Sequence, residues 1–100
     1  MLEVGKVYTF KLTSGEELVA KVKCEMTGNY VAIEEPVSIA PGPQGGLGLV
    51  PSMFTADLGQ SITLNTNSIT MYGETDESVK MKYIEATTGI KVPDKKIILG

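Results

Sequence analysis

The sequence contains no histidine, no arginine and no tryptophan, and all nine of its basic residues are lysines. Without histidine, the chain cannot build a Ser-His-Asp or Cys-His arrangement or a histidine-ligated metal site. Without arginine, it has no planar guanidinium group for bidentate binding of a phosphate or a guanine base. The paired acids Glu34 and Glu35 point to opposite faces of a strand, so they do not converge on one ion or substrate. We therefore predict a protein that is not an enzyme and has no catalytic residue, no metal site and no cofactor.

Acidic residues outnumber basic residues by twelve to nine, so the net charge at neutral pH is −3. Domains that bind nucleic acid through its phosphates are normally basic, so the composition gives no evidence of DNA binding. The lysines of the first half of the chain are interspersed with glutamates, which predicts a solvated face of mixed charge rather than a basic patch.

The chain has a single cysteine, Cys24, which cannot form an intramolecular disulfide. This composition fits a reducing compartment such as the cytoplasm. Because Cys24 lies on the apolar side of an alternating segment, we expect a small buried thiol rather than a nucleophile.

Long apolar runs are absent as well, since none approaches the ~20 residues that span a bilayer. We therefore expect no membrane partner. The opening residues have no basic segment followed by an apolar one, so we expect no secretory signal. A chain of 100 residues with 42% hydrophobic and 21% charged residues is typical of one globular domain, residues 1–100.

Most of the chain alternates between apolar and polar residues, which is the pattern of half-buried β-strands. Residues 7–40 predict three strands joined by two tight turns, and Pro36 interrupts the third strand or places it at a sheet edge. Residues 61–72 predict two further short strands that form a hairpin. So many strands with short connections favour a meander that is closed, or nearly closed, to hide its edges.

Residues 41–58 form a stretch rich in proline and glycine that predicts a long loop. Its glycines do not make a phosphate-binding loop, because no Gly-Lys-Ser/Thr follows them. Five apolar residues occur close together in this stretch: Leu47, Leu49, Val50, Met53 and Phe54. Either they anchor the loop to the core, or they form an apolar contact surface for another subunit or partner.

The segment 75–100 predicts a helix and a tail. Thr75 is a candidate N-cap, acidic residues occupy the first turn, and Gly89 is placed to end a helix of about residues 76–88. The apolar residues 97–99 are too few to form a core, so we expect them to pair with a sheet edge in this subunit or in a neighbour.

Three strands, a variable loop and two more strands resemble the Sm-like (LSm) family. The first family motif corresponds to residues 7–40, the variable loop to 41–58 and the second motif to 61–72. The positions that carry the first motif are Leu12, Gly15, Leu18, Ala20 and Val22. The stretches 41–56 and 81–87 further resemble Sm-like proteins encoded by cyanophages. The resemblance implies a mainly β fold, a small and strongly bent five-stranded antiparallel barrel, here with a C-terminal helix, in the cytoplasm of a phage host.

The resemblance also implies a homo-oligomeric ring, because Sm-like proteins pair their last two strands edge to edge with those of neighbouring subunits. The unpaired edges of a small sheet give an independent physical reason for such pairing. We therefore expect a structural or interaction module whose main partner is itself. The expected interface residues are Ile62, Leu64, Ile69 and Met71.

Binding of single-stranded RNA is the alternative function. RNA-binding members of the family place an Asp and an Asn around the turn before the third strand. Counted from Ala20, these positions fall at Met26 and Tyr30, and Asn29 is displaced by one residue. Asn65 stands at the basic position of the second motif. Because a tyrosine can stack on a base and asparagines can hydrogen-bond one, Asn29, Tyr30 and Asn65 are the candidate RNA-binding residues.

Overall fold

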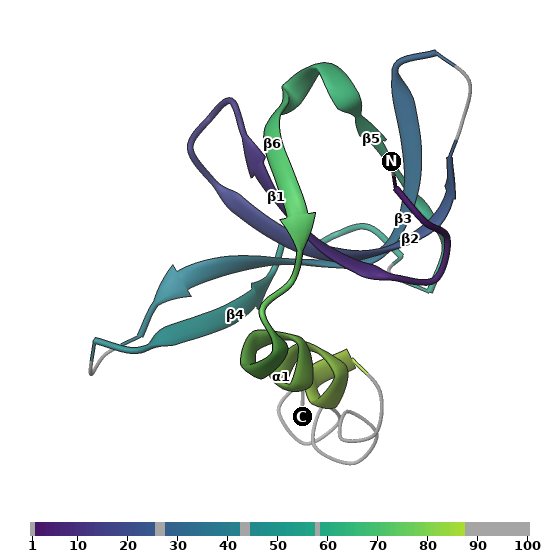
Figure 1. Ribbon diagram of the computed structural model, residues 1–100. Helices are drawn as coiled ribbons and strands as arrows, with labels where there is room; N and C mark the ends of the chain where they lie inside the picture. Colours follow the sequence, from purple (N-terminus) through teal and green to yellow (C-terminus); the bar gives the residue numbers. More distant parts are fainter. Residues whose placement is uncertain (1, 26–27, 43–44, 58, 88–100) are drawn as a thin grey trace.

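A computed structural model describes residues 2–25, 28–42, 45–57 and 59–87 (Figure 1). The elements, in chain order, are β1 (Val7–Leu12), β2 (Glu17–Glu25), β3 (Tyr30–Pro41), β4 (Leu47–Pro51), β5 (Ile62–Asn65), the 3₁₀ turn η1 (Thr66–Ser68), β6 (Ile69–Glu74) and α1 (Glu77–Thr87). The predictions of a mainly β fold and of one C-terminal helix are therefore confirmed. The predicted helix end at Gly89, the pairing of residues 97–99 and the position of Met26 lie outside the described residues.

The strands form one antiparallel sheet in the order β4-β3-β2-β1-β6, and β5 pairs with the beginning of β3. β3 has β2 on one side, so β4 and β5 both lie on its other side. Residues 30–33 of β3 pair with β5, and residues 37–41 pair with β4. β5 and β6 are the strands that end the curved part of the sheet, and they do not pair with each other.

This topology corrects two expectations. Over the residues that the structure describes, the sheet has six strands and is not closed, whereas the sequence predicted five strands in a closed or nearly closed meander. The additional strand, β4, lies within residues 41–58, a stretch whose proline and glycine content predicted a loop. It is a strand because its main chain pairs with β3. β5 and β6 do not form a hairpin, because η1 redirects the chain and each strand pairs elsewhere, β5 with β3 and β6 with β1.

The sheet buries apolar side chains on both of its faces. The larger cluster consists of Tyr8, Phe10, Leu18, Ala20, Val22, Val31 and Ile33. The smaller cluster consists of Val7, Val19, Val37 and Tyr83, the last contributed by α1. The helix therefore covers the face of the sheet opposite the larger cluster, close to the point where β4 begins to diverge (Figure 1).

Cys24 is exposed, so the prediction of a buried thiol was wrong. The register between β2 and β3 shifts between Val22, which pairs with Ile33, and Cys24, which pairs with Ala32. Such a β-bulge places two residues of one strand against one of the other and reverses the alternation of faces beyond it. The period-two pattern of the sequence does not reveal where the reversal occurs.

β3 changes course at Glu35, which has a left-handed backbone with a φ of 47°. Between the pairs Lys21–Glu34 and Val19–Val37, β3 has two residues, Glu35 and Pro36, whereas β2 has only one. Glu35 therefore lies in a β-bulge. A positive φ is uncommon for a residue other than glycine, so the surrounding contacts must hold it. Beyond this bulge, residues 37–41 and 47–51 pair as a two-stranded extension of the sheet, which we call the β3–β4 arm (Figure 1).

Helix α1 is capped by Asp76 rather than by Thr75. The Oδ2 atom of Asp76 accepts hydrogen bonds from Ser78 N–H at 3.1 Å and from Ser78 Oγ at 2.6 Å. These bonds, led by the one from the Ser78 hydroxyl, lower the pKa of Asp76. The predicted cap, Thr75, is buried instead, and its hydroxyl is hydrogen-bonded to that of Thr9 at 3.0 Å.

Candidate functional site

The structure places the three candidate RNA-binding residues near one another. Tyr30 and Asn65 are direct partners in the pairing of β3 with β5. The carbonyl of Asn29 accepts a hydrogen bond from Thr66 N–H at 2.7 Å, which continues that pairing by one step. All three residues are exposed, and 46% of the Tyr30 surface is accessible. The carboxamide oxygen of Asn65 accepts from Asn67 N–H at 2.9 Å and so holds the η1 turn.

Tyr30 contributes to an open depression of about 550 Å³ beside β6. The residues that line it are Leu2, Gly28, Tyr30, Thr66, Ile69, Thr70, Met71 and Tyr72. Among the described residues, the lining contains two aromatic rings and no charged side chain, and it does not include Asn29 or Asn65. The depression therefore offers surfaces for stacking but no cation for a phosphate.

Tyr72, which the sequence did not single out, is the second aromatic residue of this depression. Its ring contacts Tyr8 edge to face at a centroid distance of 5.9 Å, and it lies 6.2 Å from Phe10. These contacts hold the ring in place, while 45% of the residue remains accessible. The signal in the sequence was weak, because Tyr72 reaches Tyr8 and Phe10 only through the pairing of β6 with β1.

The four predicted interface residues divide into two groups. Ile62, Leu64 and Ile69 are partly buried and pack against the larger core cluster of their own chain. Met71 is 67% exposed on β6. What β5 and β6 leave for a partner is therefore mainly their main-chain edges, because among the described strands each of them pairs on one side only.

The main-chain groups at the open edge of β5 follow from the pairing with β3. Thr66 N–H donates to the carbonyl of Asn29 just beyond the strand. In an antiparallel pair, residues alternate between bonding to the partner strand and facing away from it. Thr63 and Asn65 therefore direct their N–H and C=O groups away from β3, toward the open edge.

The open edge of β6 follows in the same way from its pairing with β1. Thr75 N–H donates to the carbonyl of Val7 at 3.3 Å, so the positions that alternate with Thr75 face away from β1. These positions are Tyr72 and Glu74. Each open edge thus presents two residues, spaced by two, whose N–H and C=O groups point outward.

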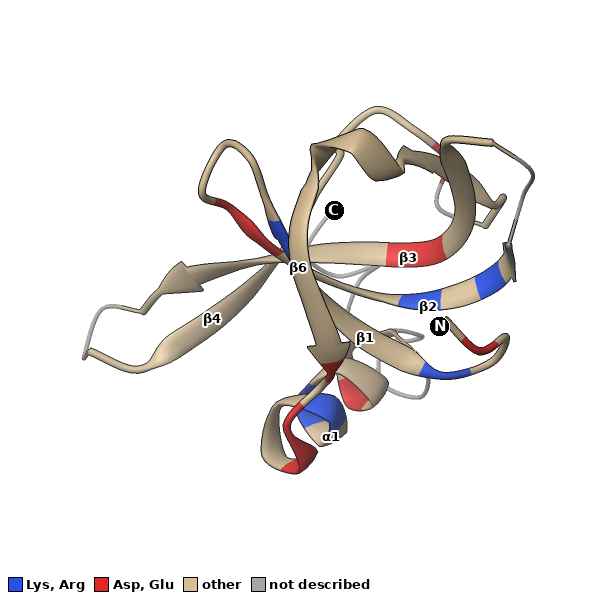
Figure 2. Ribbon diagram, turned by 45° about the horizontal axis from the view of Figure 1, so that its top comes forward, with Lys and Arg blue, Asp and Glu red and all other residues tan. Residues whose placement is uncertain are grey.

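Three of the described lysines, Lys6, Lys11 and Lys23, form ion pairs with glutamates. Figure 2 shows acidic and basic residues interspersed along the ribbon rather than a separate basic patch. The pairs described are Lys6 with Glu3 at 3.6 Å and with Glu74 at 3.3 Å, Lys11 with Glu17 at 3.8 Å, and Lys23 with Glu34 at 3.3 Å. Exposed pairs of this kind contribute little to stability. Their consequence is electrostatic, since each neutralises a lysine that would otherwise attract an anion.

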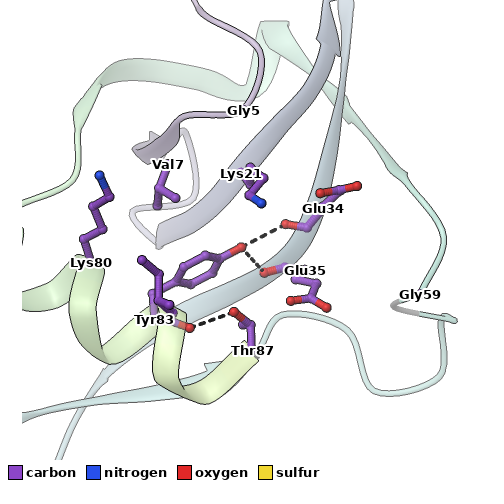
Figure 3. A pocket seen from close by; sticks show the side chains of 10 residues that line it. Gly5, Val7, Lys21, Glu34, Glu35, Gly59, Lys80, Tyr83 and Thr87 are labelled. Atoms are coloured by element: carbon purple, nitrogen blue, oxygen red, sulfur yellow. Dashed lines mark hydrogen bonds between the residues drawn. The ribbon is translucent and has the colours of Figure 1, made fainter. Parts of the chain in front are cut away.

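A second pocket of about 440 Å³ lies between α1, β3 and the N-terminal segment, and Tyr83 forms part of its wall (Figure 3). The Tyr83 hydroxyl donates to the carbonyls of Glu34 and Glu35, at 3.1 and 3.0 Å. Burial, assisted by the charge of Glu35, raises the pKa of Tyr83 far above its ordinary value. The phenol therefore stays protonated, and it acts as a hydrogen-bond donor to the bulge in β3 rather than as a base.

Among the described residues, the charged ones that line this second pocket are Lys21, Lys80, Glu34 and Glu35, so the two signs balance. Glu34 and Glu35 thus line one pocket (Figure 3), and the prediction that they point to opposite faces was wrong because the backbone of β3 is left-handed at Glu35. Within the described residues, no group of three or more His, Cys, Asp or Glu side chains is placed to hold a metal ion. We found no helix in that part of the chain with the length and apolar character needed to cross a membrane.

Comparison of the sequence with models of known protein families and with curated proteins finds no match. The most distinctive feature of the described strands is the pair of open edges on β5 and β6.

Proposed function

We propose that the protein is a non-catalytic subunit of a homo-oligomeric ring and serves as a structural or interaction module. The observation that carries this proposal is that β5 and β6 each have one open edge, although they follow each other directly in the chain. Two different edges on one chain allow head-to-tail pairing between copies. Such pairing forms a closed ring when a whole number of the rotations between neighbours adds up to a full turn. A ring leaves neither edge exposed, and so removes a template for uncontrolled aggregation.

In this proposal the architecture is Sm-like. The strands β1, β2, β3, β5 and β6 correspond to the five strands of a strongly bent barrel, and β4 is an extension that grows out of the variable loop. The curvature of the sheet and the short η1 turn between the two edge strands support this correspondence (Figure 1).

The two open edges are compatible with each other. Thr63 and Asn65 on β5, and Tyr72 and Glu74 on β6, present outward N–H and C=O groups at the same spacing of two residues. Antiparallel pairing of β5 with the β6 of the next copy joins these groups in one ladder. Each such hydrogen bond contributes about 0.5–1.5 kcal/mol net, and burial of Met71 adds a hydrophobic contribution.

The mass of the protein in solution tests this proposal. Size-exclusion chromatography with light scattering at micromolar concentration is expected to give a multiple of the chain mass of 10.7 kDa. Negative-stain electron microscopy of the same fraction is expected to show closed rings. A mass of one chain at every concentration tested would contradict the proposal.

RNA binding is a second candidate, and the specific observation that favours it is the depression lined by Tyr30 and Tyr72. Because stacking on an aromatic ring contributes about 1–3 kcal/mol per base, Tyr30→Ala is expected to weaken binding of a short single-stranded RNA by roughly 10-fold or more. Fluorescence anisotropy with A-rich and U-rich oligonucleotides measures this. Salt is expected to have a small effect, since no lysine lines the depression.

Tyr30→Phe is the matched control for the RNA experiment, because it keeps the aromatic face and removes only the hydroxyl. It is expected to retain binding. Absence of any binding at low salt would remove RNA as a ligand, while leaving the ring proposal unaffected.

A further inference from the structure

The β3–β4 arm carries no charge and exposes apolar side chains. Residues 36–56 contain no Asp, Glu, Lys or Arg, and Figure 2 shows the arm without a charged residue. Four apolar side chains in or beside the arm are exposed: Leu47 (62%), Val50 (41%), Met53 (43%) and Phe54 (83%). Of the two interpretations of this stretch, anchoring to the core holds only for Leu49, which packs against the smaller core cluster.

An uncharged edge of this kind is unusual for a strand that faces water. Soluble proteins generally protect sheet edges with charged side chains, above all lysine, or cover them. Ser52 N–H donates to the carbonyl of Pro36 at 3.2 Å, so the alternation of the ladder directs the main chain of Leu47 and Leu49 outward. At the next outward position, Pro51 has no N–H to offer. The outer edge of β4 therefore has two unprotected donors and a row of apolar side chains.

The position of β4 identifies the partner as a second copy of this chain. β4 and β5 lie on the same side of β3, so the outer edge of β4 continues the edge of β5 that the proposed ring uses. A neighbouring β6 that pairs antiparallel with β5 begins beside Asn65 and ends beside Ile62. Its direction leads toward β4, and the next element of that neighbour is its helix α1.

Helix α1 has an exposed apolar surface that suits this contact. Met81 is 58% exposed and Ile84 is 42% exposed, and residues three apart on a helix are neighbours on its surface. The helix packs on its own sheet through Tyr83, and Ile84 lines the pocket beside Tyr83, so Met81 is the more exposed of the two apolar residues and the one available to a neighbour. We propose that the β3–β4 arm of each subunit docks on helix α1 of the next subunit. This inference rests on the proposed ring and adds a second contact to it.

Cross-linking between singly substituted chains tests the contact. Val50→Cys and Met81→Cys are made separately, each with Cys24→Ser, and the two proteins are mixed, dissociated and reassembled. A short bis-maleimide is expected to give a covalent dimer with one chain of each kind. Thr13→Cys, at the exposed turn between β1 and β2, replaces Met81→Cys in the control mixture and is expected to give no such product.

A second variant tests the same contact without a new thiol. Val50→Asp changes one exposed side chain, so the fold is expected to persist by circular dichroism. Leu47 is left unchanged, because it lines a hollow with Ser78, Val79 and Lys82 of its own helix. The concentration at which the ring dissociates is expected to rise by roughly 10-fold or more, which corresponds to at least 1.4 kcal/mol.

The outcomes separate the two proposals. If the unmodified protein assembles, but the mixture gives no Val50–Met81 product and Val50→Asp dissociates at the same concentration, the arm contact is wrong and the ring stands. Cross-linking of Val50→Cys to itself would show that arms meet arms, which also overturns the contact. A monomeric unmodified protein overturns both.

Discussion

Thr63→Pro is expected to convert the assembled protein into monomers. The N–H of Thr63 faces the open edge of β5, and proline removes that donor and places its ring where the neighbouring strand would approach. The hydrogen bonds between β5 and β3 are made by the alternate residues, and the Thr63 side chain is exposed, so the subunit is expected to keep its fold. Light scattering at micromolar concentration is expected to give 10.7 kDa, with an unchanged β-sheet signal in circular dichroism.

Thr63→Val is the matched control, because valine keeps the main-chain N–H and is equally suited to a strand. It is expected to assemble as the unmodified protein does. If Thr63→Pro assembles with the same mass and the same dissociation concentration, the edge of β5 is not the interface.

Tyr83→Phe is expected to lower the free energy of unfolding by about 1–3 kcal/mol. The substitution removes only a hydroxyl, but that hydroxyl donates to the carbonyls of Glu34 and Glu35 beside the left-handed residue of β3. Both carbonyls then lose a donor in a region that Tyr83 itself buries. Urea denaturation at a fixed protein concentration measures the change, since assembly makes stability depend on concentration.

The same substitution has a pH signature. Because the pKa of Tyr83 is raised in the folded protein, the unfolded chain loses this proton first, at a pH of about 10. The contribution of Tyr83 is therefore complete below pH ~10 and is lost progressively as pH rises above that value. The stability difference between the unmodified protein and Tyr83→Phe is expected to be constant near neutral pH and to shrink in strong alkali.

Tyr30→Phe provides the control for stability, since it removes an exposed hydroxyl from the same strand. It is expected to change the free energy of unfolding by less than about 0.5 kcal/mol. An equally small effect of Tyr83→Phe would mean that its two hydrogen bonds do not support the bulge in β3.

The sequence predicted the elements whose signals are local. The alternation in residues 7–40 predicted β1, β2 and β3, and the candidate cap with an acidic first turn predicted α1. The features that it missed depend on partners distant in the chain. Residues 47–51 form strand β4 because they pair with β3. Cys24 is exposed because the β-bulge between β2 and β3 reverses the alternation of faces. Thr75 is buried where its hydroxyl is hydrogen-bonded to that of Thr9.

The candidate site shows the same division. The resemblance to Sm-like motifs singled out Asn29, Tyr30 and Asn65. The structure brings them together because Tyr30 of β3 pairs with Asn65 of β5. Tyr72 was missed because its orientation depends on aromatic contacts with β1. The open edges of β5 and β6 were also obscured, because the sequence predicted that these strands would pair with each other.

The three-residue turn η1 has a consequence for the size of the assembly. It joins β5 directly to β6, so the angle between the two open edges of a subunit depends on this turn and on the Asn65–Asn67 hydrogen bond that holds it. In a head-to-tail ring, that angle sets the rotation from one subunit to the next. In the proposed ring, the geometry of these three residues, together with the curvature of the sheet from β5 to β6, therefore contributes to the number of subunits that complete a full turn.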